Sequence, residues 1–243
     1  MVTKRGRKRH SVDRVEADKE HLTTSVSNKK LNVQCSPVRF GNMCAHLSER
    51  RRALVKDMGF GGLLEMASVH ICHKLIMWMV DNFNEEDCSL TICGKTFVLT
   101  TELFGEVMGL SDGGDDFEQQ GTDEEVINRK KQIIDGRNLL QLSDLEANLL
   151  DDNHPDDIFI GNFLLFACGT ILMPTTTVVV GTTLLSSING VHSVKSLNWA
   201  TKCLSHLVDA IRRYKKRKGE FIGGCVLFLQ VNARLHMLEV ECC

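Results

Sequence analysis

Residues 63–110 carry the densest local signals in the chain, and they read LLEMASVHICHKLIMWMVDNFNEEDCSLTICGKTFVLTTELFGEVMGL. From Leu63 to Phe83 apolar residues recur every three or four positions, which predicts a helix with one broad buried face. The predicted inward residues are Leu64, Ala67, Ile71, Leu75, Trp78 and Met79. We therefore expect Trp78 to lie in the core, on a helix around which the domain is organised.

Two short apolar runs follow and predict a β-hairpin. Residues 90–92 (LTI) and 97–99 (FVL) flank the sequence CGKT, and alternating residues on both sides of a glycine-containing turn are typical of paired strands. A short helix is predicted next, with Thr100 as its N-cap and Gly109 as its left-handed stop.

A helix is also predicted on the N-terminal side of this stretch. Ser48 is the expected N-cap of a helix over residues 49–58 that ends at Gly59. Its predicted inward residues are Ala53, Leu54 and Met58, and its predicted outward residues are Arg50, Arg51 and Lys56. The sequence GFGG at 59–62 is interpreted as a helix stop, because no Gly-Lys-Ser/Thr follows to complete a phosphate loop.

Residues 158–173 are strongly apolar and have two interpretations. A membrane span needs roughly 20 apolar residues, whereas this run stops at Pro174, so a buried core helix is favoured over a membrane protein. Further helices are predicted at 123–135, 144–150, 183–188, 198–217 and 225–238. The residues predicted to face inward from the helix at 198–217 are Trp199, Cys203, Leu204, Leu207, Ala210, Ile211 and Tyr214. Phe163 and Phe228 are also predicted core residues.

The predicted fold is mainly α: a single compact helical domain over residues 41–243 with one small β-hairpin, preceded by a disordered basic tail over residues 1–40. A chain of 243 residues with 43% apolar content can fill one sizeable core. Truncation of the gene product is one interpretation of the C-terminus, because the chain ends at Cys242-Cys243 without a closing signal.

Charge is distributed unevenly along the chain. Residues 1–31 contain nine Lys/Arg against four Asp/Glu, whereas residues 111–157 contain fourteen Asp/Glu against four Lys/Arg. The compact N-terminal cluster consists of Lys4, Arg5, Arg7, Lys8 and Arg9. It is interpreted as a nuclear import signal, with a merely solvated tail as the alternative, and Arg5-Gly6-Arg7 partly matches a DNA-binding AT-hook in which Lys8 replaces the expected proline.

A second basic cluster closes the helix predicted at 198–217. Its members are Arg212, Arg213, Lys215, Lys216, Arg217 and Lys218. Cations there stabilise the helix dipole, so one interpretation is a solvated helix end. The other is a second import signal or a patch that contacts the DNA backbone.

The sequence predicts no catalytic, cofactor-binding or metal-ligating residue. The ten cysteines follow no signal peptide, so reduced thiols are expected, and Cys72, Cys168, Cys203 and Cys225 are expected in the core. His70 with His73 and Cys88 with Cys93 lack further convergent zinc ligands. The acidic residues 151–157 are interpreted as a solvated linker. No small-molecule substrate is evident.

A set of ordered sequence blocks resembles a known family. The blocks are SERRRALVKDMGFGGLL at 48–64, WMVDNF at 78–83, GKTFVLT at 94–100, VMGL at 107–110, FACGT at 166–170, PTT at 174–176, NWA at 198–200 and GGCVLFLQ at 223–230. Their order is similar to that in the helical domain of plant transposon-encoded proteins related to the aminotransferase-like plant mobile domain. Such domains often lie upstream of SUMO-protease-like (ubiquitin-like protease) cysteine peptidases.

This resemblance implies a mobile-element context and transfers no functional residue. The chain departs from the family where Thr100-Thr101-Glu102-Leu103 replaces Thr-Pro-Glu-Asp, and no lysine has a convincing pyridoxal-phosphate setting. We expect a transposon-derived, non-enzymatic nuclear interaction module that binds an unknown protein partner, with nonspecific DNA as the expected ligand of its basic segments. The alternative is the N-terminal accessory fragment of a SUMO-protease-like polyprotein that lacks its catalytic domain.

Overall fold

A computed structural model describes residues 31–66, 69–92, 94–117, 128, 131, 133, 140–175, 179–180, 185, 190–217 and 220–241. The chain divides into two units, Met1–Lys30 and Leu31–Cys243, and only the second contains described residues. The second unit begins at Leu31, whereas the helical domain was predicted to begin at residue 41. The short strand β1 (Asn32–Val33) pairs with β7 (Phe221–Ile222), and Phe40 is buried, so this segment is part of the folded unit.

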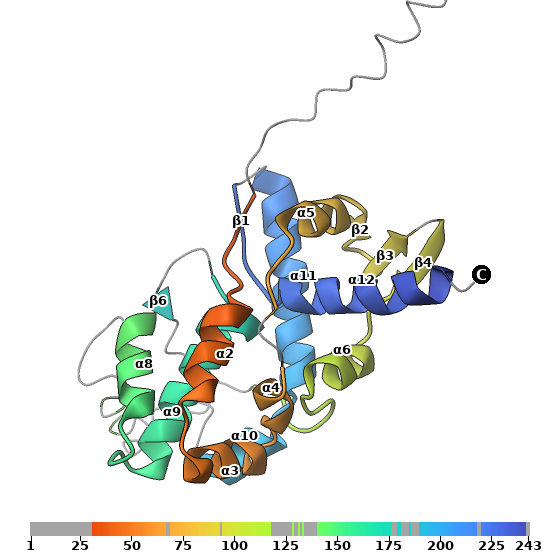
Figure 1. The fold of residues 1–243 in the computed structure, drawn as a ribbon. Coiled ribbons are helices and arrows are strands. Elements are labelled where there is room, and N and C mark those ends of the chain that lie inside the picture. The colour runs from red at the N-terminus through yellow and green to blue at the C-terminus, as the bar shows by residue number, and fades with distance from the viewer. Residues whose placement is uncertain are drawn as a thin grey trace, which may run out of the picture. The chain divides into compact units, whose positions relative to one another are not determined.

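The second unit is mainly helical, as predicted, and its centre is α9 (Asp156–Ala167) with its π-helical continuation η2 (Cys168–Leu172). Residues 159–167 are all buried, because a helix that is apolar all round must be covered on every side. It packs against α2 (Pro37–Ala45), α8 (Leu142–Leu150) and α10 (Gly190–Ser196) (Figure 1). The predicted buried helix at 158–173 is thus confirmed. Within the described part of the chain, none of the helices combines the length and apolar character needed to cross a bilayer.

The helix α3 (Glu49–Asp57) forms where it is predicted, and Gly59 follows it in the left-handed region with φ 87°. Its buried face differs from the prediction. Arg51 and Val55 are buried, whereas Ala53 is exposed. An arginine can occupy this inward position because the structure supplies a carboxylate and carbonyl oxygens around its guanidinium group.

The long helix predicted over residues 63–83 is wrong. The short helix α4 (Gly61–Leu64) ends early, and α5 spans only His73–Asp81. Between them, Oε1 of Gln230 accepts from the backbone N–H of Cys72 at 2.7 Å, and Nε2 of Gln230 donates to the carbonyl of His70 at 2.9 Å. These bonds from a buried side chain hold residues 70–72 out of helical conformation, and the predicted inward residue Ala67 lies outside the described residues.

The break in the predicted helix changes which residues of α5 are buried. The buried residues are Ile76, Met79 and Val80, whereas Trp78 is 43% exposed, so the prediction of a core Trp78 is wrong. The prediction of a core Cys72 is also wrong, because this residue is exposed. The helical spacing counted from Leu64 does not predict the buried face of α5, because residues 69–72 are not helical.

The predicted hairpin is confirmed as β3 (Ser89–Ile92) and β4 (Lys95–Val98). Ile92 pairs with Lys95, so the turn has two residues, and the φ of 77° at Gly94 suits such a tight turn. β2 (Phe83–Asn84) adds a third strand that the sequence did not predict. Two other small pairs, β1 with β7 and β5 (Leu140–Gln141) with β6 (Val179–Val180), also exceed the single hairpin expected.

The helix α6 (Thr101–Met108) has both predicted ends. The hydroxyl of Thr100 accepts from the backbone N–H of Leu103 at 3.2 Å, and Gly109 is left-handed with φ 64°. In α8, by contrast, the helix begins at Leu142, two residues before the predicted start at residue 144. The helices predicted at 123–135 and 183–188 lie largely outside the described residues.

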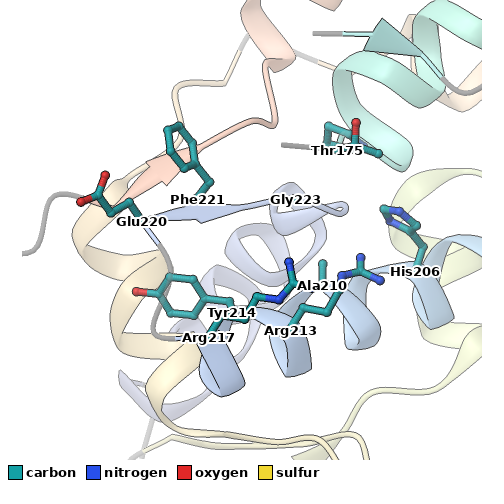
Figure 2. A pocket seen from close by; sticks show the side chains of 10 residues that line it. Thr175, His206, Ala210, Arg213, Tyr214, Arg217, Glu220, Phe221 and Gly223 are labelled. Atoms are coloured by element: carbon teal, nitrogen blue, oxygen red, sulfur yellow. The ribbon is translucent and has the colours of Figure 1, made fainter. Parts of the chain in front are cut away.

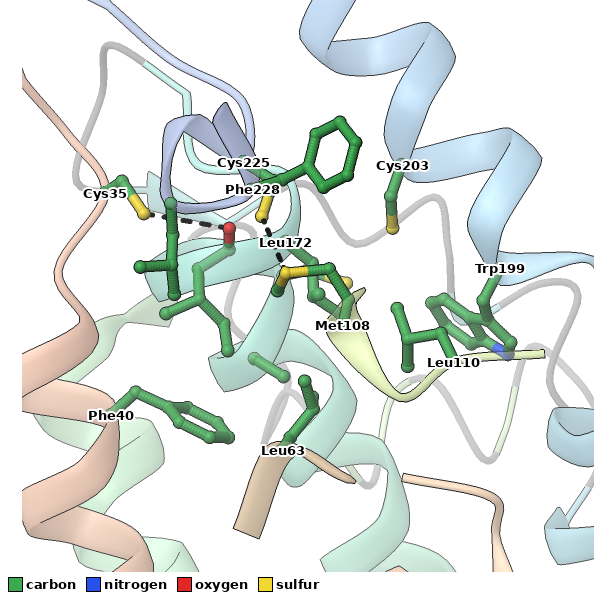
Figure 3. Packing of buried hydrophobic residues seen from close by; sticks show 14 of the residues in the cluster. Cys35, Phe40, Leu63, Met108, Leu110, Leu172, Trp199, Cys203, Cys225 and Phe228 are labelled. Carbon is green, nitrogen blue, oxygen red and sulfur yellow. Dashed lines mark hydrogen bonds between the residues drawn. The ribbon is translucent and has the colours of Figure 1, made fainter. Parts of the chain in front are cut away.

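Two long helices complete the fold, α11 (Trp199–Arg217) and α12 (Val226–Glu241). The predicted inward face of α11 is confirmed from Trp199 to Ile211, and Tyr214 is half-buried. Phe163 and Phe228 are fully buried, as predicted. Cys203 and Cys225 lie in the same core as Trp199 (Figure 3), in agreement with the prediction for these thiols.

Candidate nucleic-acid interface

The predicted candidate cations form two groups, and the structure describes only the second. The N-terminal group lies outside the described residues; its members are Lys4, Arg5, Arg7, Lys8 and Arg9. The second group lies in the last turns of α11. There the structure describes Arg212, Arg213, Lys215, Lys216 and Arg217, whereas Lys218 lies outside the described residues.

Arg212 and Lys215 tie the end of α11 to the segment that follows α5. Nζ of Lys215 donates to Oε2 of Glu85 at 2.8 Å and to the carbonyl oxygen of Phe83. Arg212 donates to Oδ1 of Asp209 at 2.7 Å and to the carbonyl oxygen of Glu85 at 3.3 Å. Because their charges are already paired within the chain, these two cations mainly stabilise the fold.

Arg213, Lys216 and Arg217 are exposed and form no ion pair with any residue that the structure describes. Positions four apart lie on the same face of a helix, so Arg213 and Arg217 share one face of α11. Of the second predicted group, these three cations are the ones that can meet an external anion.

A pocket of about 490 Å³ opens beside Arg213 and Arg217 (Figure 2). One wall is a single face of α11, to which His206, Ala210 and Tyr214 also belong, since the spacings of three and four residues match the helical turn. The opposite wall comes from two other segments. Its described residues are Pro174, Thr175, Glu220, Phe221 and Gly223.

The opposite wall is positioned by β7 and by two glycines. In the parallel pairing of β7 with β1, Ile222 is buried and Phe221 is left 45% exposed on the pocket side. A Cβ atom at Gly223 would lie 2.3 Å from the carbonyl oxygen of Pro174, and one at Gly224 would lie 2.8 Å from Cα of Leu207. Only glycine allows the three segments to approach this closely.

Two side chains that line the pocket have shifted pKa values. Burial, followed by the charge of Arg213, lowers the pKa of His206, so its imidazole is neutral at pH 7. Nδ1 of His206 is buried and has no hydrogen-bond partner among the described residues. Burial, followed by the charge of Asp81, raises the pKa of Tyr214, so its phenol stays protonated and can donate.

These groups are chemically suited to an anion with an attached planar or apolar part. Arg213 and Arg217 supply charge-assisted donors, and Phe221 supplies an exposed ring. The single carboxylate that lines the pocket within the described residues is that of Glu220, so positive charge dominates.

The buried thiols of the described residues are poorly suited to nucleophilic chemistry. Burial raises the pKa of Cys35, Cys44 and Cys168 to about 12 each. The thiolate is the reactive form, so these cysteines act as small core residues at neutral pH.

The segments considered for metal binding have other contacts. The carbonyl of His70 and the N–H of Cys72 both bond to Gln230, and Cys93 lies outside the described residues. In the part of the chain that the structure describes, no three His, Cys, Asp or Glu side chains converge on a point that could hold a metal ion.

The acidic residues 151–157, predicted to be a solvated linker, include two exposed carboxylates that also pair with arginines of α3. Oδ1 of Asp156 accepts from Arg51 at 2.8 Å and from Arg50 at 2.5 Å, and Asp152 lies 3.6 Å from the Arg51 guanidinium. The prediction of an outward Arg51 is wrong, because its side chain is buried and its guanidinium group pairs with these carboxylates. Because these two carboxylates are paired with arginines of α3, not every carboxylate of the acidic segment is available to repel an anionic partner.

Sequence reasoning missed the pocket residues His206, Glu220 and Phe221. The spacing of His206, Ala210, Arg213 and Arg217 at four, three and four residues is a signal that could have placed the first of them on the cationic face. The pairing of β7 with β1 leaves no comparable local signal, because each strand has only two residues.

Comparison with known proteins gives one family match. The family model described as a domain of unknown function (DUF8566) matches residues 33–230. Neither a curated protein nor a solved structure matches the chain.

Proposed function

We propose that this chain, which belongs to the family of domains of unknown function DUF8566, is a non-enzymatic nuclear module that associates with nucleic acid through its basic segments. The observation that carries the proposal is a group of exposed cations at the end of α11 that form no ion pair with a described residue, Arg213, Lys216 and Arg217. The dense N-terminal cluster of Lys and Arg adds a second cationic segment.

The arrangement of acidic residues is compatible with this proposal. The carboxylates of Asp152 and Asp156 face the arginines of α3. Figure 1 shows α3 at the end of the second unit away from β1, whereas the last turn of α11 leads toward β1 and β7. A phosphate backbone at the end of α11 therefore approaches cations without passing over this acidic segment.

The resemblance to plant transposon-encoded helical domains supports a nuclear, mobile-element context. The high pKa values of the buried thiols Cys35, Cys44 and Cys168 support a binding role over a cysteine-dependent reaction.

Duplex DNA binding by the full-length chain tests this proposal. We expect the triple variant Arg213→Gln, Lys216→Gln, Arg217→Gln to bind a duplex at low salt with at least about tenfold lower affinity, because three phosphate contacts are lost. The matched control changes three exposed lysines elsewhere, Lys56→Gln, Lys74→Gln and Lys195→Gln, with the same change in net charge. Equal losses in both triple variants would contradict a localised interface, and no binding by the unaltered chain would overturn the proposal.

The nuclear part of the proposal has its own test. We expect a full-length fluorescent fusion to accumulate in the nucleus, and to lose this accumulation when Lys4, Arg5, Arg7, Lys8 and Arg9 are changed to Ala. Unchanged nuclear accumulation of that variant would contradict the role of the cluster as an import signal.

A further inference from the structure

The pocket between α11 and β7 has features beyond those that a backbone-binding patch requires. A helix end that contacts only phosphates needs cations on a surface. Here two of the cations border a hollow of about 490 Å³, a volume in the range of small-ligand pockets. Lys216, on the same turns of α11, does not line it.

The apolar part of the pocket is also specific. Phe221 is 45% exposed, while its strand neighbour Ile222 is buried, so the ring lies at the pocket although a polar residue would be less costly there. An aromatic ring beside guanidinium groups is the combination that proteins use to bind nucleobases attached to a phosphate.

Further polar groups line the pocket, and one of them lacks a hydrogen-bond partner among the described residues. Nδ1 of His206 is buried without a hydrogen bond to any described residue, which costs free energy in the unliganded protein. Glu220 provides an acceptor at the opposite wall, and Tyr214 provides a hydroxyl group (Figure 2). A ligand with both donors and acceptors satisfies these groups, whereas inorganic phosphate alone does not reach Phe221 and Nδ1 together.

We propose that this pocket binds a single nucleotide, with its phosphate on Arg213 and Arg217 and its base against Phe221. The inference rests on the proposed function in that it assigns a ligand to the same cationic end of α11. Free nucleotides and unpaired nucleotides of a single strand present the same chemistry. A base paired within a duplex cannot enter, because its faces are covered by its neighbours.

Fluorescence of 2-aminopurine, which is quenched when the base stacks, tests this proposal. The full-length chain is titrated with 2-aminopurine deoxyribonucleoside monophosphate, with a single-stranded oligonucleotide that carries one 2-aminopurine, and with the corresponding duplex. We expect the 2-aminopurine emission of the mononucleotide or of the single strand to be quenched, with saturation at one nucleotide or strand per protein chain. Saturation by the mononucleotide identifies a free-nucleotide site, and saturation by the strand alone identifies a single-strand site; either supports the proposal.

Two variants separate the pocket from general charge. We expect Arg213→Gln with Arg217→Gln to weaken nucleotide affinity by at least about tenfold, because two charge-assisted contacts to phosphate are lost. We expect Phe221→Ser to abolish the quenching. The matched controls are Lys56→Gln with Lys74→Gln, which removes two exposed cations outside the pocket, and Val98→Ser, which changes an apolar residue that is 58% exposed in β4. Both controls should bind the nucleotide as the unaltered chain does, and thermal unfolding confirms that each variant is folded.

The outcomes distinguish this inference from the proposed function. Duplex binding without quenching by the mononucleotide or the single strand overturns the pocket proposal and leaves the proposed function intact. Quenching that survives both pocket variants also overturns it. Nucleotide binding without any duplex binding supports the pocket and contradicts the backbone interface.

Discussion

The guanidinium group of Arg51, whose side chain is fully buried, donates to Oδ1 of Asp156 at 2.8 Å and joins α3 to the start of α9. The same group donates to the carbonyl oxygens of Asp152 and His154 and lies 4.5 Å from the ring centre of Phe159. We expect Arg51→Leu to lower the free energy of unfolding by about 2–4 kcal/mol, because these acceptors lose their buried donor.

A neighbouring arginine provides the control for Arg51. Arg50 also contacts Asp156, but its side chain is 62% exposed, so Arg50→Gln should cost less than about 1 kcal/mol. Urea unfolding of both variants measures the difference. Equal losses of unfolding free energy in Arg51→Leu and Arg50→Gln would mean that burial adds nothing to the contribution of the Arg51 contacts.

Gly62 and Gly109 meet across the contact between α4 and the end of α6. A Cβ atom on either residue would lie 2.7 Å from Cα of the other. We expect Gly62→Ala to destabilise the chain by about 1–3 kcal/mol through overpacking, as measured by denaturant unfolding. Gly94→Asn is the control, because that position has a φ of 77° but no atom within 4 Å of the added Cβ, and Asn tolerates this conformation. A similar loss in both variants would contradict the close approach.

The two tryptophans of the chain should behave differently. Trp199 is buried between Phe60 and Phe117, and its Nε1 donates to the carbonyl of Val194 at 2.8 Å. We expect Trp199→Phe to cost about 2 kcal/mol, and Trp78→Ala to cost no more than about 1 kcal/mol because Trp78 is 43% exposed.

Quenching by iodide provides an independent measurement on the same residues. With Trp199 removed, the remaining Trp78 emission should be quenched readily, whereas with Trp78 removed the Trp199 emission should be protected. Protection of the Trp78 emission from iodide would contradict its exposed position and support the core position predicted from the sequence.

How far the sequence predicts this fold depends on whether a signal is local. The caps of α6, the hairpin turn at Gly94 and the inward face of α11 were predicted correctly, because each is fixed by residues within a few positions. The helix across residues 65–72 was predicted wrongly, because Gln230 from α12 binds the backbone there. No pattern near residue 70 reveals a partner so distant in sequence.

The candidate site was predictable only in part, for the same reason. The cations at the end of α11 are evident in the sequence. The sequence does not reveal that Arg212 and Lys215 contact Glu85, whereas the other described cations of this group form no ion pair with a described residue. The pocket needs the approach of residues 174–175 and β7 to α11, which Gly223 and Gly224 permit.

The ion pair between Glu85 and Lys215 predicts a dependence of stability on pH. The hydrogen bond from Lys215 lowers the pKa of Glu85. The stabilisation by this ion pair is therefore fully present above the pKa of Glu85 in the unfolded chain, about 4.3. It is lost as the pH falls through the lower pKa of Glu85 in the folded chain. A double-mutant cycle with Glu85→Gln and Lys215→Met should give about 0.5–1 kcal/mol at pH 7 and a smaller coupling energy at pH 3. A coupling energy that is unchanged between pH 7 and pH 3 would show that the charge on Glu85 does not carry it.

A salt series of duplex binding tests most directly whether the cations at the N-terminus and at the end of α11 bind the nucleic-acid backbone. Each phosphate contact contributes about −0.9 to the slope of log affinity against log salt concentration. Removal of the five N-terminal cations should reduce the magnitude of the slope by about 4 to 5, and removal of Arg213, Lys216 and Arg217 should reduce it by about 3. Slopes unchanged in both variants, or no binding by the full-length chain at low salt, would contradict the claim.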